Sequence, residues 1–158
     1  MSDYLKLLIR NPDTNEQLWF EYPFDMDKIR ETLHIKGDDY TVIDSNSSAP
    51  VYEYDSIESI VEDYNEYLLL PDYIKRNINK ILDVVDGIGD IFNAVTEKRV
   101  AIYENCKDKY DLARELLRKR GDVPEDIIDY IDSDRYIYDV TINSNIIETP
   151  DGVIEIRY

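Results

Sequence analysis

Residues 37–74 carry ten acidic side chains and no lysine, arginine or histidine. Inside this stretch, residues 55–67 hold five acids, while the apolar residues recur at the spacing of one helix face. The pattern predicts a helix with one buried face and with Glu58, Glu62 and Glu66 stacked on another face. Like charges one turn apart repel and destabilise a helix by about 0.2–0.5 kcal/mol per pair. A row of uniform charge therefore needs an explanation other than helix stability.

The rest of the charge is also segregated along the chain. Residues 121–134 form a second stretch without a base and contain six acids, whereas bases cluster at 75–76, 98–99 and 118–120. The net charge is −17 over 158 residues, so the folded chain repels nucleic acids and anionic membranes and attracts basic surfaces. Because 43% of the residues are hydrophobic, the chain can fold and is not a disordered acidic tail.

Two interpretations of the acidic rows remain open on composition alone. Acidic faces can be solvated surfaces that keep a protein soluble, for which a net charge magnitude of about 2–8 is enough. The larger excess here raises a DNA mimic as the second interpretation, while solvated acidic faces remain the first on composition alone. Carboxylates one helical turn apart are separated by about 6 Å, close to the phosphate spacing along one DNA strand. Duplex DNA carries one negative charge about every 1.7 Å of its axis, and a surface of similar charge would enter a basic DNA-binding groove.

The periodicity of the sequence predicts an α+β fold with three small domains. Residues 1–54 are predicted to form an N-terminal α/β domain, residues 55–97 a central helical domain, and residues 98–158 a C-terminal α/β domain. N-cap residues, prolines and glycines mark the expected helix ends. The expected strands are 4–10, 18–24, 39–45, 99–106 and 135–142, followed by a closing hairpin at 145–158. The expected helices begin at Asp25, Ser56, Pro71, Gly89, Asp108 and Pro124, and those at Asp25 and Pro71 end at Gly37 and Gly87.

The sequence offers little for catalysis or metal binding. His34 is the only histidine and is expected to be part-buried and structural, and no Cys or His residues have the spacing of a zinc site. Cys106 is the only cysteine, so we expect a packed thiol, no internal disulfide and a reducing compartment. We expect no catalytic residue, no metal and no cofactor. No apolar run approaches the roughly 18 residues of a membrane span, so we expect a cytoplasmic protein that does not bind membranes.

Residues 121–140, GDVPEDIIDYIDSDRYIYDV, resemble the antirestriction motif of ArdA-type proteins. In that motif an acidic helix of the form P-E-x-[LI]-x-x-Y-I-D is followed a few residues later by an aspartate. The matching positions here are Pro124, Glu125, Ile127, Tyr130, Ile131, Asp132 and Asp139. Residues 101–122 resemble the strand and helix that precede the motif, and residues 68–78 resemble the central helical region of the family.

The resemblance implies an antirestriction protein that acts as an acidic DNA mimic. ArdA-type proteins are elongated homodimers of three small domains, encoded on mobile genetic elements. They imitate bent B-form DNA and competitively occupy the DNA-binding groove of type I restriction-modification enzymes, without catalysing a reaction. Together with the charge pattern, this implies partner-binding roles for Asp55, Glu58, Glu62, Asp63, Glu66, Asp122, Glu125, Asp126, Asp129 and Asp132.

Three other interpretations remain at this stage. The same surface would suit a DNA mimic aimed at another DNA-binding system, such as an anti-CRISPR protein or a partner of a nucleoid protein. An acidic adaptor would bind one basic protein partner through tyrosine-rich faces, since the chain has fourteen tyrosines. A metal-dependent enzyme would use clustered aspartates such as Asp38 and Asp39. The target system, any block of modification and the dimer contacts are not decided by the sequence.

Overall fold

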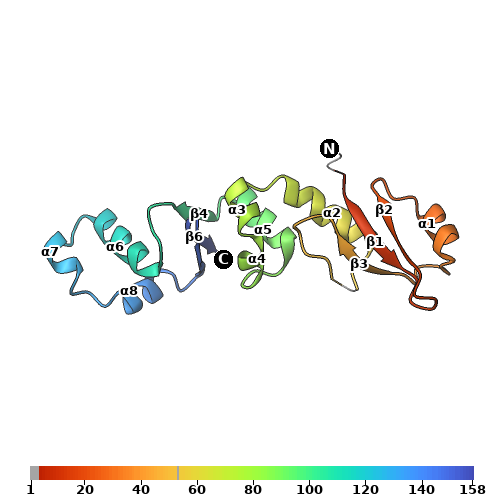
Figure 1. Ribbon diagram of the computed structural model, residues 1–158. Helices are drawn as coiled ribbons and strands as arrows, with labels where there is room; N and C mark the ends of the chain where they lie inside the picture. Colours follow the sequence, from red (N-terminus) through yellow and green to blue (C-terminus); the bar gives the residue numbers. More distant parts are fainter. Residues whose placement is uncertain (1–3, 53) are drawn as a thin grey trace. The chain divides into compact units, whose positions relative to one another are not determined.

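The computed structural model describes residues 4–52 and 54–158. Within them it contains eight helices and two antiparallel sheets of three strands each, so the predicted α+β class is confirmed (Figure 1). Contacts divide the chain into two compact units, Met1–Leu70 and Pro71–Tyr158. The finer division into three domains at 54/55 and 97/98, and their elongated arrangement, stay predictions.

The sheet of the first unit has the strand order β2-β1-β3. Its strands are β1 (Lys6–Arg10), β2 (Gln17–Glu21) and β3 (Thr41–Ser45), all within the segments predicted as strands apart from Gln17. Leu7 and Ile9 of the central strand are fully buried, whereas Lys6, Leu8 and Arg10, which alternate with them, are only half-buried. Because successive side chains of a strand point to opposite faces, this alternation means that one face of β1 packs in the core.

Helix α1 (Met26–Leu33) begins at the predicted cap, Asp25, whose carboxylate accepts hydrogen bonds from the amides of residues 27 and 28. The helix ends before the predicted Gly37, because His34 adopts a left-handed conformation with φ 54°. The buried side-chain amide of Asn11 donates to the carbonyl of Leu33 at 2.9 Å, and so provides a partner for one of the last carbonyls of the helix. His34 itself is exposed, so its predicted partial burial was wrong.

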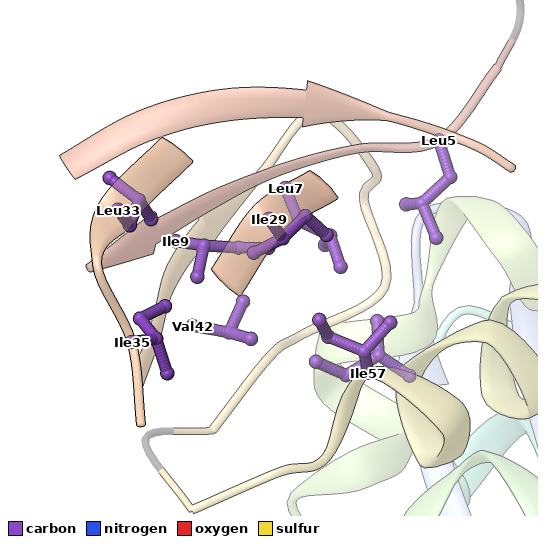
Figure 2. Packing of buried hydrophobic residues seen from close by; sticks show 9 residues of the cluster. Leu5, Leu7, Ile9, Ile29, Leu33, Ile35, Val42 and Ile57 are labelled. Atoms are coloured by element: carbon purple, nitrogen blue, oxygen red, sulfur yellow. The ribbon is translucent and has the colours of Figure 1, made fainter. Parts of the chain in front are cut away.

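Helix α2 (Ile57–Leu68) begins at the predicted cap Ser56, whose hydroxyl accepts from the amide of Ser59 at 3.1 Å. Its buried side chains Ile57 and Ile60 belong to the core of the first unit. Figure 2 shows labelled side chains from β1, α1, β3 and the start of α2 pointing into this common core. The predicted amphipathic helix is therefore present, and its apolar face is anchored on the first sheet and α1.

Three short helices open the second unit: α3 (Asp72–Arg76), α4 (Ile78–Leu82) and α5 (Gly87–Thr96). The prediction of one helix from Pro71 to Gly87 was wrong, because the backbone of Asn77 leaves the helical conformation. The Asn77 side chain donates to the carbonyl of Tyr73 at 2.7 Å and to the carboxylate of Asp151 at 2.8 Å. Side-chain hydrogen bonds of this kind compete with helix continuation.

The second sheet has the strand order β4-β6-β5. Its strands are β4 (Val100–Tyr103), β5 (Ser144–Thr149) and β6 (Gly152–Arg157), and the predicted closing hairpin is confirmed. Gly152 has φ +131°, and a Cβ placed there would lie 2.5 Å from the Tyr103 carbonyl oxygen. Only glycine allows β4 and the hairpin to approach this closely.

Helix α6 (Lys109–Arg120) begins at the predicted cap Asp108 and buries Leu112 and Leu117. Cys106 is buried in the same core as Leu112, and this burial raises the pKa of its thiol above the ordinary value. The expectation of a packed thiol is confirmed. None of the helices in the described residues combines the length and hydrophobicity that crossing a bilayer requires.

Two further helices follow α6: α7 (Glu125–Ile128) and α8 (Ser133–Val140). The strand predicted at 135–142 is wrong. Asp132 caps α8 by accepting a hydrogen bond from the Arg135 amide at 3.2 Å. The buried residues Ile137 and Thr141 are one turn apart, and Ile137 packs into the core that includes Leu112 of α6. Packing at helical period therefore overrides the alternating pattern of tyrosines that suggested a strand.

Candidate partner-binding surfaces

A groove of about 1090 Å³ lies in the first unit beside the predicted acidic row. One wall is a single face of α2, contributed by residues 57, 58, 61, 62, 65 and 66. The lining also includes Tyr22, Phe24, Met26 and Tyr40. The Tyr40 hydroxyl accepts from the amide of Ile57 at 3.0 Å and so ties the start of α2 to the segment before β3. We call this hollow the α2 groove.

Four predicted partner-binding residues lie together at the α2 groove, and a fifth does not. Asp55, Glu58, Glu62 and Glu66 line it, and the Asp55 carboxylate also accepts from the Tyr52 amide at 2.9 Å. Asp63 is turned toward a small depression lined by residues such as Leu5, Val51 and Tyr64. The structure therefore separates Asp63 from the row of three glutamates.

Burial and neighbouring carboxylates on α2 disfavour the ionised forms of Asp63 and Glu66. Burial, followed by the charges of Glu62 and Asp63, raises the pKa of Glu66 above its ordinary value. Burial, followed by the charges of Asp55 and Glu62, raises the pKa of Asp63 in the same direction. Across residues 4–52 and 54–158, none of Glu58, Glu62, Asp63 and Glu66 forms an ion pair. The predicted row is thus an acidic surface without internal neutralisation.

The acidic residues of the second unit differ from the α2 row, because arginines of α6 form ion pairs with several of them. Three predicted positions form ion pairs at 2.9–3.2 Å. The pairs are Arg120 with Asp122, Arg118 with Glu125, and Arg114 with Asp129. The hydrogen bond from the Arg120 guanidinium lowers the pKa of Asp122 below its ordinary value. The sequence analysis located bases at 118–120 but did not predict these pairings.

Asp126 and Asp132 complete the predicted acidic set of the second unit. Both are exposed, but the Asp132 carboxylate is engaged as the cap of α8. Asp126 has no ion pair or side-chain hydrogen bond to any residue in the described part of the chain. Of the five predicted carboxylates in this unit, Asp126 is therefore the one most available to an external cation.

The predicted antirestriction motif spans α7 and most of α8. Pro124 precedes the first turn of α7, and Ile128 is the residue that anchors this helix, with only 2% of its surface exposed. Ile128 occupies a variable position of the motif, so sequence reasoning did not select it. The motif residues point outward instead: Tyr130 is 87% exposed and Ile127 48% exposed. Ile131 is half-buried and Asp139 is exposed.

Comparison with known proteins agrees with this motif. The family model described as antirestriction protein (ArdA) matches residues 16–155, which includes the acidic row, the motif and the closing hairpin. The chain belongs to the ArdA family of antirestriction proteins. The predicted resemblance is thereby confirmed, and membership assigns an antirestriction function directed at restriction enzymes. No curated protein matches the chain.

In this ArdA protein the negative charge is concentrated in the first unit. Residues 1–70 contain 16 acidic and 5 basic residues, a net charge of −11. Residues 71–158 contain 19 acidic and 13 basic residues, a net charge of −6. The first unit therefore presents more uncompensated charge to a basic partner, in agreement with its unpaired row on α2.

The structure gives no support to a metal site at the clustered aspartates. No three acidic, His or Cys side chains among residues 4–52 and 54–158 gather in a way that would hold a metal ion. The Asp38 carboxylate accepts a hydrogen bond from Arg30 at 2.9 Å.

Proposed function

We propose that this ArdA protein is a DNA mimic that competitively occupies the DNA-binding groove of a type I restriction-modification enzyme. The observation that carries the proposal is the row Glu58, Glu62 and Glu66 on α2. These carboxylates repel one another, lack ion pairs in the described structure, and face a common side of the helix. A fold that needed α2 only for stability would gain from bases in this row.

The mechanism follows from the chemistry of carboxylates at phosphate-like spacing. Lysine and arginine side chains that hold DNA phosphates form charge-assisted hydrogen bonds with carboxylates as well. Counterions condensed on the acidic surface are released on binding, as they are from DNA, so affinity falls steeply with salt. This mechanism is occlusion and needs no catalytic residue, metal or cofactor.

The internal ion pairs rank the predicted partner-binding residues. Glu58, Glu62, Glu66 and Asp55 at the α2 groove, with Asp126 on α7, are the carboxylates most available to a partner. Asp122, Glu125 and Asp129 must exchange an internal arginine for one of the partner, which reduces their net gain. Asp63 and Asp132 contribute through the general negative field, because one lies outside the groove and the other caps α8.

We further propose that the protein acts as a homodimer in the cytoplasm of a cell that carries it on a mobile genetic element. Support for self-association comes from large apolar side chains exposed on the second unit. Tyr130 is 87%, Tyr138 65% and Ile142 58% exposed. Aromatic residues are enriched at protein interfaces. Sedimentation of the purified protein at micromolar concentration tests the dimer, and a monomer under these conditions would contradict it.

A DNA-competition gel shift tests the mimic. A type I restriction-modification enzyme is bound to its labelled target, and the protein is titrated in at two salt concentrations. We expect DNA release near stoichiometric protein and weaker release at higher salt. The variant with Glu58, Glu62 and Glu66 all changed to glutamine should lose most of this activity, whereas each single change should have a small effect.

The matched control removes the same charge from exposed positions of the first unit that do not line the α2 groove. It carries Asp13→Asn, Glu16→Gln and Glu31→Gln. If the control loses as much activity as the triple glutamate variant, net charge and not the row on α2 is responsible. If the unaltered protein leaves DNA on the type I enzyme but releases it from a CRISPR effector, the target assignment is wrong and the mimic stands. If it releases DNA from no such enzyme, the adaptor interpretation replaces the mimic.

A further inference from the structure

We infer that the α2 groove is a docking site for a cationic peptide segment that carries a bulky apolar side chain. The inference deepens the proposed function, on which it rests for the kind of partner: the segment belongs to the basic DNA-binding protein that is inhibited. A mimic that worked by charge alone would need carboxylates on a surface but no hollow between them. The groove therefore adds a second, apolar component to recognition.

Much of the groove lining is aromatic and aliphatic, and we call this part the floor. Tyr22, Phe24, Met26, Tyr40, Ile57 and Val61 all line it. Tyr22 and Phe24 pack edge to face, with ring centroids 6.0 Å apart and an interplanar angle of 80°. Tyr22 is 43% exposed, and Tyr54, which also lines the groove, is 94% exposed. Apolar surface that remains open in a concave site is typical of binding sites for partners.

Much of the remaining lining is acidic, and we call the acidic part the rim. Asp38, Asp39 and Asp55 line it together with the α2 row. Arg30 is the one basic lining residue among those that the structure describes. Its guanidinium is already engaged, donating to the Gly37 carbonyl at 2.8 Å and to the Asp38 carboxylate at 2.9 Å. The negative field over the apolar floor is therefore hardly opposed from within the groove.

Charge complementarity and size select the occupant. The acidic rim repels nucleic acids, acidic peptides and anionic lipids, and attracts lysine and arginine. The tyrosine rings add cation–π contacts for the same side chains. The volume of about 1090 Å³ exceeds the roughly 300–1,000 Å³ of sites for small ligands, so it suits a segment of several residues. An apolar anchor flanked by basic residues satisfies both the floor and the rim.

Fluorescence anisotropy with the full chain and two labelled probe peptides tests this inference. The peptides have equal length and equal net positive charge. The first alternates lysine and arginine with phenylalanine and leucine, and the second has serine in place of every apolar residue. We expect the first to bind roughly tenfold or more tightly than the second, the scale expected for burying one large apolar side chain. The higher affinity of the first peptide should persist at about 1 M salt, where exposed charges are screened within about 3 Å.

Two variants locate the site without disturbing the core. The double variant Tyr22→Ala and Tyr54→Ala should bring the two peptides to equal affinity, because both tyrosines are exposed parts of the groove. Asn65→Arg places a positive charge on the exposed groove face of α2 and should weaken both peptides. The matched control is Tyr158→Ala, which removes a tyrosine that is 74% exposed and does not line the groove, and it should change neither affinity.

Equal affinity of the two peptides for the unaltered protein would overturn the inference. An equal effect of Tyr158→Ala and of the groove double variant would do the same. These outcomes are separable from failure of the mimic, which is measured by DNA release. If the unaltered protein releases DNA but does not discriminate between the peptides, mimicry stands and the docking site is rejected. If it discriminates but releases no DNA, the groove stands and its partner is not a DNA-binding enzyme of the tested class.

Discussion

Replacing Glu62 with glutamine should stabilise the first unit at neutral pH, although it removes a charge that we assign to partner binding. Glu62 lies one helical turn from both Glu58 and Glu66 on α2. Each like-charge pair at this spacing costs about 0.2–0.5 kcal/mol, so removing two pairs should gain about 0.4–1 kcal/mol. For a unit of this size, 1 kcal/mol corresponds to roughly 4–8 °C in Tm. We therefore expect the midpoint to rise by roughly 2–8 °C.

The pH dependence of this gain has a definite sign. Glu62 contributes to the raised pKa of both Asp63 and Glu66. A carboxyl group whose pKa is raised by folding contributes stability that is fully present below its ordinary pKa. That stability is lost as the pH rises through the raised value. The gain from Glu62→Gln should therefore grow as the pH rises above the ordinary values of 3.8 for Asp63 and 4.5 for Glu66, and shrink in acid.

Trp19 provides the assay, because it is the only tryptophan and lies on β2 of the first unit. Thermal unfolding followed by its fluorescence at pH 7 reports this unit directly. Measurements at about 0.01 M and about 1 M salt, where the Debye length falls from about 30 Å to 3 Å, should show the gain shrinking. The control Asp27→Asn removes an acid that pairs with Arg30 at 3.5 Å in the first turn of α1, and should lower the midpoint slightly.

The reasoning would be refuted by a lower Trp19 midpoint for Glu62→Gln at low salt, or by a gain that does not respond to salt. Either result would mean that the glutamate row does not destabilise α2 and needs no functional explanation. If the gain is accompanied by weaker DNA competition, stability and function oppose each other at the same residue. Such opposition is common where binding surfaces hold uncompensated charge.

Three further predictions concern the second unit. Gly152→Ala should destabilise this unit by roughly 1–3 kcal/mol in urea unfolding followed by circular dichroism, because its methyl group meets the Tyr103 carbonyl; an unchanged midpoint would contradict this. Asp151→Asn should lower the thermal midpoint at pH 7. It should also reduce the fall of that midpoint on acidification. Arg76 holds the pKa of Asp151 below its ordinary value of 3.8, so its stabilisation is present above that pH and lost as the pH falls through the lowered value. Cys106 should react with a thiol reagent at pH 7 only after unfolding, because burial raises its pKa, and rapid labelling of the native protein would argue against this packing.

The sequence by itself determined the elements whose signals are local. Asp25, Ser56 and Asp108 cap helices as predicted, because a cap depends on amides two or three residues away. The amphipathic α2 and the closing hairpin also follow from near neighbours, and the charge balance follows from composition. The family motif and the acidic row could therefore be recognised from the order of the residues alone.

Only the tertiary structure decided how these parts meet. The helix break at Asn77 depends on Asp151, 74 residues further along the chain. Formation of α8 depends on the core that it shares with α6, which outweighs the alternating tyrosines. The arginines of α6 form ion pairs with most of the acids near α7, whereas none of the described bases forms an ion pair with the row on α2. Whether a carboxylate is a cap, half of an ion pair or a free charge depends on which groups folding places beside it, and sequence spacing does not carry that information.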